Sequence, residues 1–168
     1  TGFPFLDACM KFLQTNGWIN FRMRAMIMSF ASYNMWQPWQ KTSPLLAELF
    51  TDYEPGIHIS QVQMQSGVTG INLPRIYSVT KQSMDQDPNA DWIKSLIPKL
   101  REFDPKLVHD ANLNNSYIPK IVDLKESAKF ARDQVWSIRK NKHFKNEAKL
   151  VYLKHGSRRK RRLAANQR

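Results

Sequence analysis

Apolar residues recur at helical spacing along most of the chain, and no stretch alternates in the way that a half-buried strand does. Residues 4–14 begin with Pro4, place their apolar side chains on one face and are followed by Gly17, which predicts a helix. Residues 19–36 are apolar around most of the helical circumference, as expected for a buried central helix, and Pro38 ends them. The pattern therefore predicts an all-α fold, an irregular helical bundle.

Shorter helices are predicted further along. Ser43-Pro44 indicates the start of a helix that runs to Phe50, followed by a loop over residues 51–59 and a helix over residues 60–66. Residues 71–90 have few periodic apolar positions and predict an ordered loop. Two further short helices are predicted, one over residues 90–100 and one starting at Asp104-Pro105.

The character of the chain changes at Asp123. Asp123 is followed three residues later by Glu126, a capping-box pattern that predicts a helix to about Arg139. A second helix is predicted over residues 142–155, and the arginine-rich residues 157–162 predict a segment without fixed structure. We therefore divide the sequence into a helical domain, residues 1–122, and a basic helical extension with a tail, residues 123–168.

The positive charge lies at one end of the chain. Residues 1–119 carry ten Lys/Arg and ten Asp/Glu, whereas residues 120–168 carry 16 Lys/Arg and four Asp/Glu, which is the whole net charge of +12. Such an excess is typical of a surface that binds a polyanion, or of a solubilising tail. On the first interpretation, DNA would be bound independently of its sequence. The residues expected to contact its phosphates are Arg139, Lys140, Arg158, Arg159, Lys160, Arg161 and Arg162.

The composition limits the class of protein. The single cysteine, Cys9, excludes an internal disulfide, offers no metal-ligand cluster and fits a reducing, cytoplasmic setting. No apolar run is long enough for a membrane span, and no secretory signal pattern is present. We therefore expect a cytoplasmic protein with neither a metal site nor a membrane partner.

Two arginines and two carboxylates are the main polar pattern in the apolar part of the chain. Arg22 and Arg24 open the apolar segment, and Asp52 and Glu54 lie in a loop bounded by proline and glycine. An arginine that enters an apolar run needs acceptors, because an unpaired buried guanidinium is costly. The spacing therefore predicts a buried polar seam, and by itself it is explained by a structural ion pair.

Several motifs carry a resemblance to a known family. They are TGFPFLDACM at residues 1–10, GW at 17–18, RMR at 22–24, DYEP at 52–55, QMQSG at 63–67 and PRIY at 74–77. In this order they resemble the C-terminal half of the flavin-binding helical domain of the DNA photolyase and cryptochrome family, over roughly residues 1–125. The resemblance implies flavin adenine dinucleotide (FAD) as the cofactor.

The resemblance also implies roles for residues of the polar seam. It implies that Arg24 pairs with Asp52 beside the flavin ring, and that Asp52, Tyr53 and Glu54 lie along the isoalloxazine. A buried carboxylate stranded by loss of Arg24 would then cost several kcal/mol, on the order of what is lost when a buried pair is broken. His58 would face flavin N5, where the family commonly has asparagine. The alternative for His58 is a loop histidine that hydrogen-bonds to the backbone.

Other positions match the family or depart from it. Arg22 would border the cavity for the DNA lesion, Phe21 stands where the family often has a polar lesion contact, and Met64 replaces a frequently aromatic one. Trp39 falls at the middle position of the family's tryptophan chain for electron transfer. Val62 replaces the member nearest the flavin, and a saturated side chain cannot carry a hole. Trp39 as core packing is therefore the alternative to a redox role.

The resemblance implies a light-dependent flavoprotein of photolyase type, which transfers an electron from FAD to a pyrimidine dimer flipped out of damaged duplex DNA. A cryptochrome-like blue-light receptor without repair activity is the alternative, favoured by Phe21 and Met64. A non-catalytic helical DNA-binding remnant is the third interpretation.

We predict that this chain alone binds FAD weakly or not at all. In the family, the phosphate-binding segment and the first flavin-contacting helix precede the part that this sequence resembles, so we expect an N-terminal half to complete the pocket. Absorbance of the purified chain in the flavin bands tests this, and a stoichiometric yellow complex would contradict it.

Overall fold

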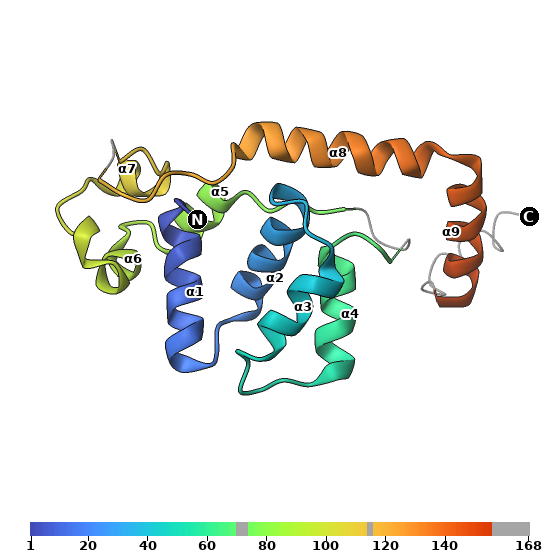
Figure 1. The fold of residues 1–168 in the computed structure, drawn as a ribbon, viewed down its shortest axis with the longest axis horizontal. Helices are drawn as coiled ribbons and strands as arrows, with labels where there is room; N and C mark the ends of the chain where they lie inside the picture. Colours follow the sequence, from blue (N-terminus) through green and yellow to red (C-terminus); the bar gives the residue numbers. More distant parts are fainter. Residues whose placement is uncertain (70–73, 114–115, 156–168) are drawn as a thin grey trace, which may run out of the picture.

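The structure, a computed structural model, describes residues 1–69, 74–113 and 116–155, and every regular element in these ranges is helical (Figure 1). The all-α prediction is confirmed. The elements are α1 (Pro4–Asn16), α2 (Phe21–Ser29), the π-helix η1 (Phe30–Asn34), α3 (Trp39–Ala47), α4 (Pro55–Gln65), α5 (Val79–Gln86), α6 (Asp91–Leu96), the 3-10 helix η2 (Pro98–Leu100), α7 (Pro105–His109), α8 (Leu124–Lys140) and α9 (Lys142–His155).

Helix α1 forms one side of the core and anchors the loop that follows α3. Its buried residues include Leu6, Cys9 and Leu13, and burial raises the pKa of the Cys9 thiol to about 12. The helix ends at Gly17, which has a φ of +66° and donates its N–H to the Leu13 carbonyl. The Gly17 carbonyl in turn accepts from the backbone N–H of Thr51 at 2.8 Å and from its hydroxyl at 3.1 Å.

The central helix differs in detail from the single helix predicted over residues 19–36. It begins at Phe21, because Asn20 caps it by accepting from the backbone N–H of Met23. After Ser29 the helix widens into the π-helix η1, and Trp36 follows in the left-handed region with a φ of +52°. The C-terminal part of α2, residues 25–29, is buried on all sides, and the Ser29 hydroxyl at its end donates to the carbonyl of Arg75 in the segment leading to α5.

The predicted starts of α3 and α4 were wrong. Helix α3 begins at Trp39, four residues before the predicted Ser43, and it contains Pro44 in its interior. Helix α4 begins at Pro55, where the prediction had a loop to residue 59. Proline is favoured in the first turn of a helix, because its missing N–H would have no partner there. The consequence for the site is that His58 lies on a helix face and not in a loop.

Helix α5 was missed, because residues 71–90 were predicted to form a loop. The buried face of α5 carries Gln82 and Ser83 beside Val79, so apolar periodicity is absent from its sequence. The face is held by polar contacts: the Nε2–H of His109 donates to the Pro88 carbonyl at 2.9 Å, which leaves Nδ1 to accept from the Ser83 hydroxyl at 2.7 Å. The helix predicted over residues 90–100 is split into α6 and η2 at Pro98.

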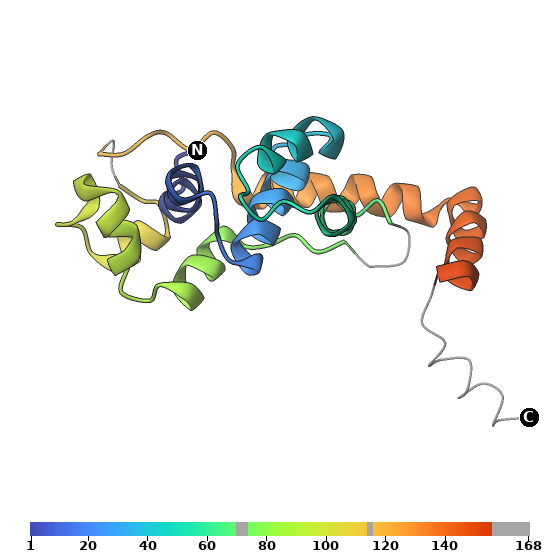
Figure 2. The same ribbon diagram turned by 90° about the horizontal axis from the view of Figure 1, so that it is seen from below.

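Helix α8 begins beside the bundle and runs beyond it (Figures 1 and 2). Asp123 caps α8 by accepting from the backbone N–H groups of Lys125 and Glu126, as its sequence pattern predicted. Helix α8 packs on η1, where the Asn34 amide donates to the Ser127 hydroxyl at 2.9 Å. Helix α9 turns across the far end of α8. The predicted division at residues 122 and 123 stays a prediction, and the predicted segment 157–162 lies outside the described residues.

No helix in the described part of the chain combines the length and the apolar character needed to cross a bilayer.

We predict that Gly17→Ala destabilises the fold by about 1 kcal/mol or more, because alanine is strained at a positive φ. Its Cβ would also clash with the Thr51 side chain and disturb the loop beside the site. Urea denaturation measures the loss. Gly56→Ala is the matched control, because Gly56 has no positive φ and its added Cβ would come no nearer than 3.1 Å to another side chain. Equal stability of wild type and Gly17→Ala would contradict the predicted strain.

Candidate functional site

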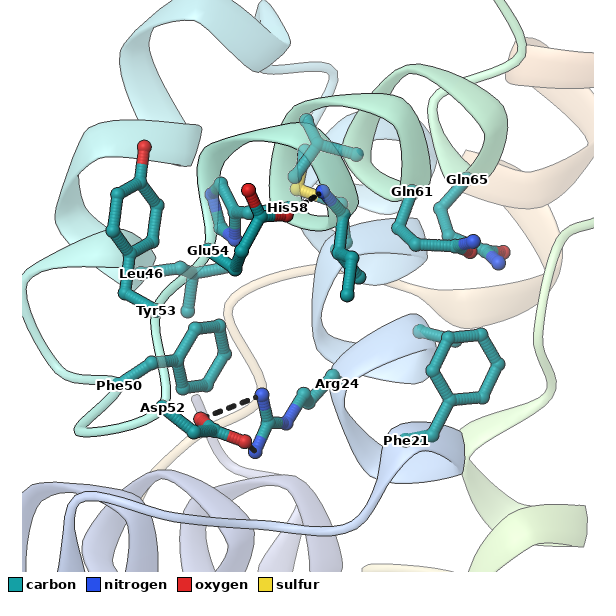
Figure 3. Close-up of a pocket in the computed structure, with 14 residues that line it drawn as sticks. Phe21, Arg24, Leu46, Phe50, Asp52, Tyr53, Glu54, His58, Gln61 and Gln65 are labelled. Atoms are coloured by element: carbon teal, nitrogen blue, oxygen red, sulfur yellow. Dashed lines mark hydrogen bonds and ion pairs between the residues drawn. The ribbon is translucent and has the colours of Figure 1, made fainter.

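A pocket with a cavity volume of about 140 Å³ lies between α2, α4 and the loop that follows α3 (Figure 3). Its floor is apolar, and its rim carries charged, amide and aromatic groups. It is lined by Phe21, Arg24, Ala25, Met28, Leu46, Phe50, Asp52, Tyr53, Glu54, Ile57, His58, Gln61, Val62 and Gln65. The pocket thus contains the acidic turn, the second arginine of the RMR motif and one complete face of α4.

Arg24 is held in one orientation by contacts on several sides. Its Nη1 and Nη2 atoms donate to the two carboxylate oxygens of Asp52 at 3.0 and 2.9 Å. Its Nε donates to the Ile19 carbonyl at 2.6 Å, and its guanidinium lies 4.2 Å from the centroid of the Phe50 ring. The expected pairing of Arg24 with Asp52 is therefore present, and it is the bidentate form that fixes a guanidinium most firmly.

Asp52 is charged and partly in water. The hydrogen bonds from Arg24 hold the pKa of its carboxyl below the ordinary value. Its side chain is 48% exposed, against 23% for Arg24. The expected buried seam is therefore wrong at its acidic end, because water still reaches the carboxylate. Loss of Arg24 would not strand Asp52 in an apolar interior, so the cost is smaller than that of breaking a buried pair.

The other two residues of the acidic turn play local structural parts. Glu54 is the N-cap of α4, and its carboxylate accepts from the backbone N–H of Ile57 at 2.6 Å. Tyr53 is 44% exposed, and its ring meets the ring of His58 edge-on with centroids 5.3 Å apart. Their predicted contacts with flavin stay predictions.

His58 is only 8% exposed and joins α4 to α3. Its Nε2 lies 3.1 Å from the Ser43 carbonyl oxygen and 2.9 Å from the Ser43 hydroxyl. Because a carbonyl oxygen only accepts, Nε2 carries the proton, and Nδ1 of the neutral ring remains an acceptor. His58 therefore bonds to a backbone carbonyl, as in the alternative given above, but it lies in helix α4 and not in a loop. Its role opposite flavin N5 stays a prediction.

Gln61, Gln65 and Phe50 line the pocket and were missed by the sequence-based prediction. The side-chain oxygen of Gln61 is buried and has no hydrogen-bond partner among the described residues. Gln65 is 6% exposed. The spacing of Ile57, Gln61 and Gln65 was a signal that could have found them, because residues four apart share a helix face. The misplaced start of α4 concealed it.

The residues predicted to contact the lesion or to carry electrons are dispersed. Phe21 lies at the pocket rim and is 56% exposed, and Val62 is buried in the floor. Arg22 is exposed and Met64 half-buried, and neither is among the described residues that line the pocket. Trp39 is half-buried against the core outside the pocket, so the structure does not bring it to Arg24 and Asp52.

The residues predicted to contact DNA phosphates lie at the C-terminal end of α8, as far as they are described. Arg139 and Lys140 form the last turn of α8. The Arg139 guanidinium lies 5.8 Å from the ring of Trp136 and 5.2 Å from the ring of Phe144. The cluster Arg158, Arg159, Lys160, Arg161 and Arg162 lies outside the described residues.

Comparison with known proteins decides the family. The model of the family described as "FAD binding domain of DNA photolyase" matches residues 1–137. The chain belongs to this family. FAD is accordingly the cofactor of the domain family to which the chain belongs, as the resemblance implied.

Relatives include both repair enzymes and cryptochromes by name. The deoxyribodipyrimidine photo-lyase of Alkalihalophilus pseudofirmus is 30% identical over 112 residues, 66% of this chain and 23% of that protein. The cryptochrome DASH of Gloeobacter violaceus is 27% identical over 142 residues, 76% of this chain and 28% of that protein. The chain thus spans about a quarter of the length of these relatives.

A solved structure agrees with the fold. The crystal structure of the archaeal photolyase from Sulfolobus tokodaii, solved with two FAD molecules, superposes with a TM-score of 0.75 at 25% sequence identity. The superposition covers 82% of this chain and 33% of that one.

The pocket residues fit one side of a flavin ring. An apolar floor suits the planar ring, the Gln61 side-chain oxygen, which has no partner among the described residues, offers a hydrogen-bond acceptor, and the Arg24–Asp52 pair supplies both a cation and an acceptor. The volume of about 140 Å³ is smaller than the roughly 300–1,000 Å³ of most ligand pockets. The described residues therefore form a wall that is too shallow to enclose the whole cofactor.

We predict that Arg24→Ala lowers the free energy of unfolding at neutral pH by about 1–3 kcal/mol, through loss of the ion pair and of the bond to the Ile19 carbonyl. Because the pKa of Asp52 is depressed in the folded protein, the ion-pair part is present above the ordinary carboxyl value of 3.8 and is lost as pH falls through the lower folded value.

Urea denaturation of both proteins at neutral pH and well below pH 3.8 tests this. The difference in unfolding free energy between wild type and Arg24→Ala should shrink in acid. The part that comes from the Ile19 and Phe50 contacts should persist. Arg24→Lys keeps the charge but loses the bidentate geometry, so an intermediate stability is expected. A difference independent of pH would show that the Asp52 contact contributes nothing.

Proposed function

We propose that this chain is the flavin-facing part of a light-dependent flavoprotein of DNA photolyase type, acting on ultraviolet-induced pyrimidine dimers in DNA. The observation that carries the proposal is the bidentate Arg24–Asp52 pair at the edge of an apolar pocket, where the Gln61 amide oxygen has no partner within the described part of the chain. These groups lie within the residues that match the FAD-binding family.

The chain's residues would orient the cofactor and tune its charge. Arg24, held in place by Asp52, would put a positive charge beside the flavin ring and would favour negative charge on it, and Asp52 or its backbone would accept a hydrogen bond from the ring. The floor residues Met28, Leu46 and Val62 exclude water from one ring face. When bound, FAD supplies the light-excited electron.

Substrate recognition would use the exposed surface around the rim. A dimer inside the base stack is out of reach, so it must leave the duplex before an electron reaches it. Phe21 is 56% exposed at the rim and can stack on a base, and Arg22 is exposed one residue further along. The basic helices α8 and α9 would contact the phosphates of the duplex without reading its sequence.

We further propose that additional polypeptide closes the pocket, as the N-terminal half of the domain does in the family that the chain resembles. The argument is the size of the cavity, which is too small to enclose FAD.

A cryptochrome-like receptor without repair is the second candidate. Specific observations favour it: Phe21 cannot donate a hydrogen bond to a lesion, Met64 lies outside the described pocket lining, and one relative is named a cryptochrome. A helical DNA-binding protein without flavin is the third.

The longest natural form of the protein decides between the three. We expect flavin absorbance in the purified protein and light-dependent repair of thymine-dimer DNA. Flavin photoreduction without repair would favour the receptor. Absence of flavin would contradict both light-driven functions.

Arg24→Ala should lower flavin occupancy at least tenfold, on the order of the 1.4 kcal/mol that one factor of ten represents. Arg22→Ala is the matched control for occupancy, because Arg22 is the same residue type two positions away and is not among the described pocket-lining residues.

A further inference from the structure

A second cleft lies on the other side of the central helix. Its volume is about 560 Å³, within the range of ligand-binding pockets, and it shares no described lining residue with the first pocket. One wall is formed by η1, the start of α3 and the turn after α4, and the other by the C-terminal half of α8 and the start of α9. The outer wall residues Ile138, Arg139 and Phe144 lie beyond residue 137, where the family match ends.

Tryptophan rings line the inner wall of the cleft. Trp36 is 44% exposed although it is a large apolar side chain, and its ring meets the ring of Phe130 edge-on at 5.1 Å. Trp36 also lines the cleft, so its side chain forms part of the cleft surface. Trp39 lines the same wall, half-buried at the start of α3. Flat aromatic surfaces of this kind are what a nucleobase stacks on.

The backbone beneath the cleft is held in costly conformations. Trp36 has a φ of +52°, which is uncommon for a bulky residue. It follows a π-helix, in which Ser32 and Tyr33 line the cleft and have buried hydroxyls without a hydrogen-bond partner among the described residues. Such features concentrate at binding sites, where function maintains them against their cost.

The mouth of the cleft is positively charged. The Arg139 guanidinium lies 5.2 Å from the ring of Phe144, which holds it at the outer wall. Residues 138–155 contain six Lys/Arg and one acidic residue. An anionic ligand is therefore favoured over a neutral or cationic one. A chain of phosphates fits best, because the basic residues continue along α9.

We propose that this cleft binds an unpaired nucleotide of a nucleic-acid strand, with its base stacked on Trp36 and its phosphate paired with Arg139. The inference rests on the proposal that α8 and α9 contact nucleic acid, but it is independent of flavin chemistry. A polypeptide segment in the cleft is the competing occupant, and the combination of aromatic wall and basic mouth favours the nucleotide.

The test compares two probes on the full chain: a fluorescent oligothymidylate of about 10 nucleotides, within the length that single-strand sites cover, and an abasic strand of the same length. Both carry the same phosphates, so only stacking separates them. We expect wild type to bind the base-bearing strand about tenfold more tightly, as one stacked base provides. Equal affinities would overturn the proposal and leave the cleft to a polypeptide.

Trp36→Gly locates the stacked base. Glycine tolerates the positive φ, so the substitution removes the ring without adding strain. We expect the preference for the base-bearing strand to vanish, and the affinity for the abasic strand to stay the same. Trp18→Ala is the control, since Trp18 is similarly exposed at 50% and lies outside the cleft. A preference that survives in Trp36→Gly would overturn the proposal, and Trp36→Asn, which also tolerates the positive φ, gives the same decision if the glycine variant does not fold.

Charge variants separate this inference from the proposed function. Arg139→Gln should weaken binding of both strands more than Arg132→Gln, which removes the same charge from the same helix outside the cleft lining. It should also reduce the salt slope by about one. Arg24→Ala should leave the base preference intact, whatever happens to flavin. Failure of both strands to bind at low salt would overturn this inference together with the DNA part of the proposed function.

Discussion

The contact between Arg24 and Asp52 is the constraint on which the site depends. It connects α2 to the turn that precedes α4, and the same guanidinium reaches the Ile19 carbonyl and the Phe50 ring. One residue before Asp52, Thr51 bonds to the Gly17 carbonyl at the end of α1. The turn is therefore fixed from two helices at once. Because Glu54 in this turn caps α4, the position of the pocket-lining face of α4 follows from it.

The central helix serves two faces of the molecule. Its first part, α2, supplies Arg24 and Met28 to the first pocket, and its continuation, η1, carries Ser32 and Tyr33 to the second cleft. The change from α-helix to π-helix after Ser29 rotates the following side chains relative to a regular helix. That change presents Trp36 next to α8, where it packs on Phe130. A single element thus positions both sites.

Family membership and local geometry answer different questions here. The family establishes the helical FAD-binding domain, but function is argued from the side chains of the site. His58 is engaged with Ser43 of α3, Val62 forms an apolar floor, and Trp39 lies away from the pocket. The resemblance predicted flavin contact or electron transfer at these positions, so experiments on these residues are the test of those roles.

The sequence alone determined the features that arise from neighbouring residues. Pro4 and Gly17 bound α1, and Asp123 begins α8, because caps and chain breakers act within one helical turn. Tertiary structure decided what depends on distant partners. Helix α5 is held by Ser83 bonded to His109, 26 positions away, so no local periodicity marks it. Gln61 and Gln65 were hidden for a similar reason, since Pro55 fits a loop as well as a first helical turn. Even the pairing of Arg24 with Asp52 came from family resemblance, because spacing along a chain does not specify which groups meet after packing.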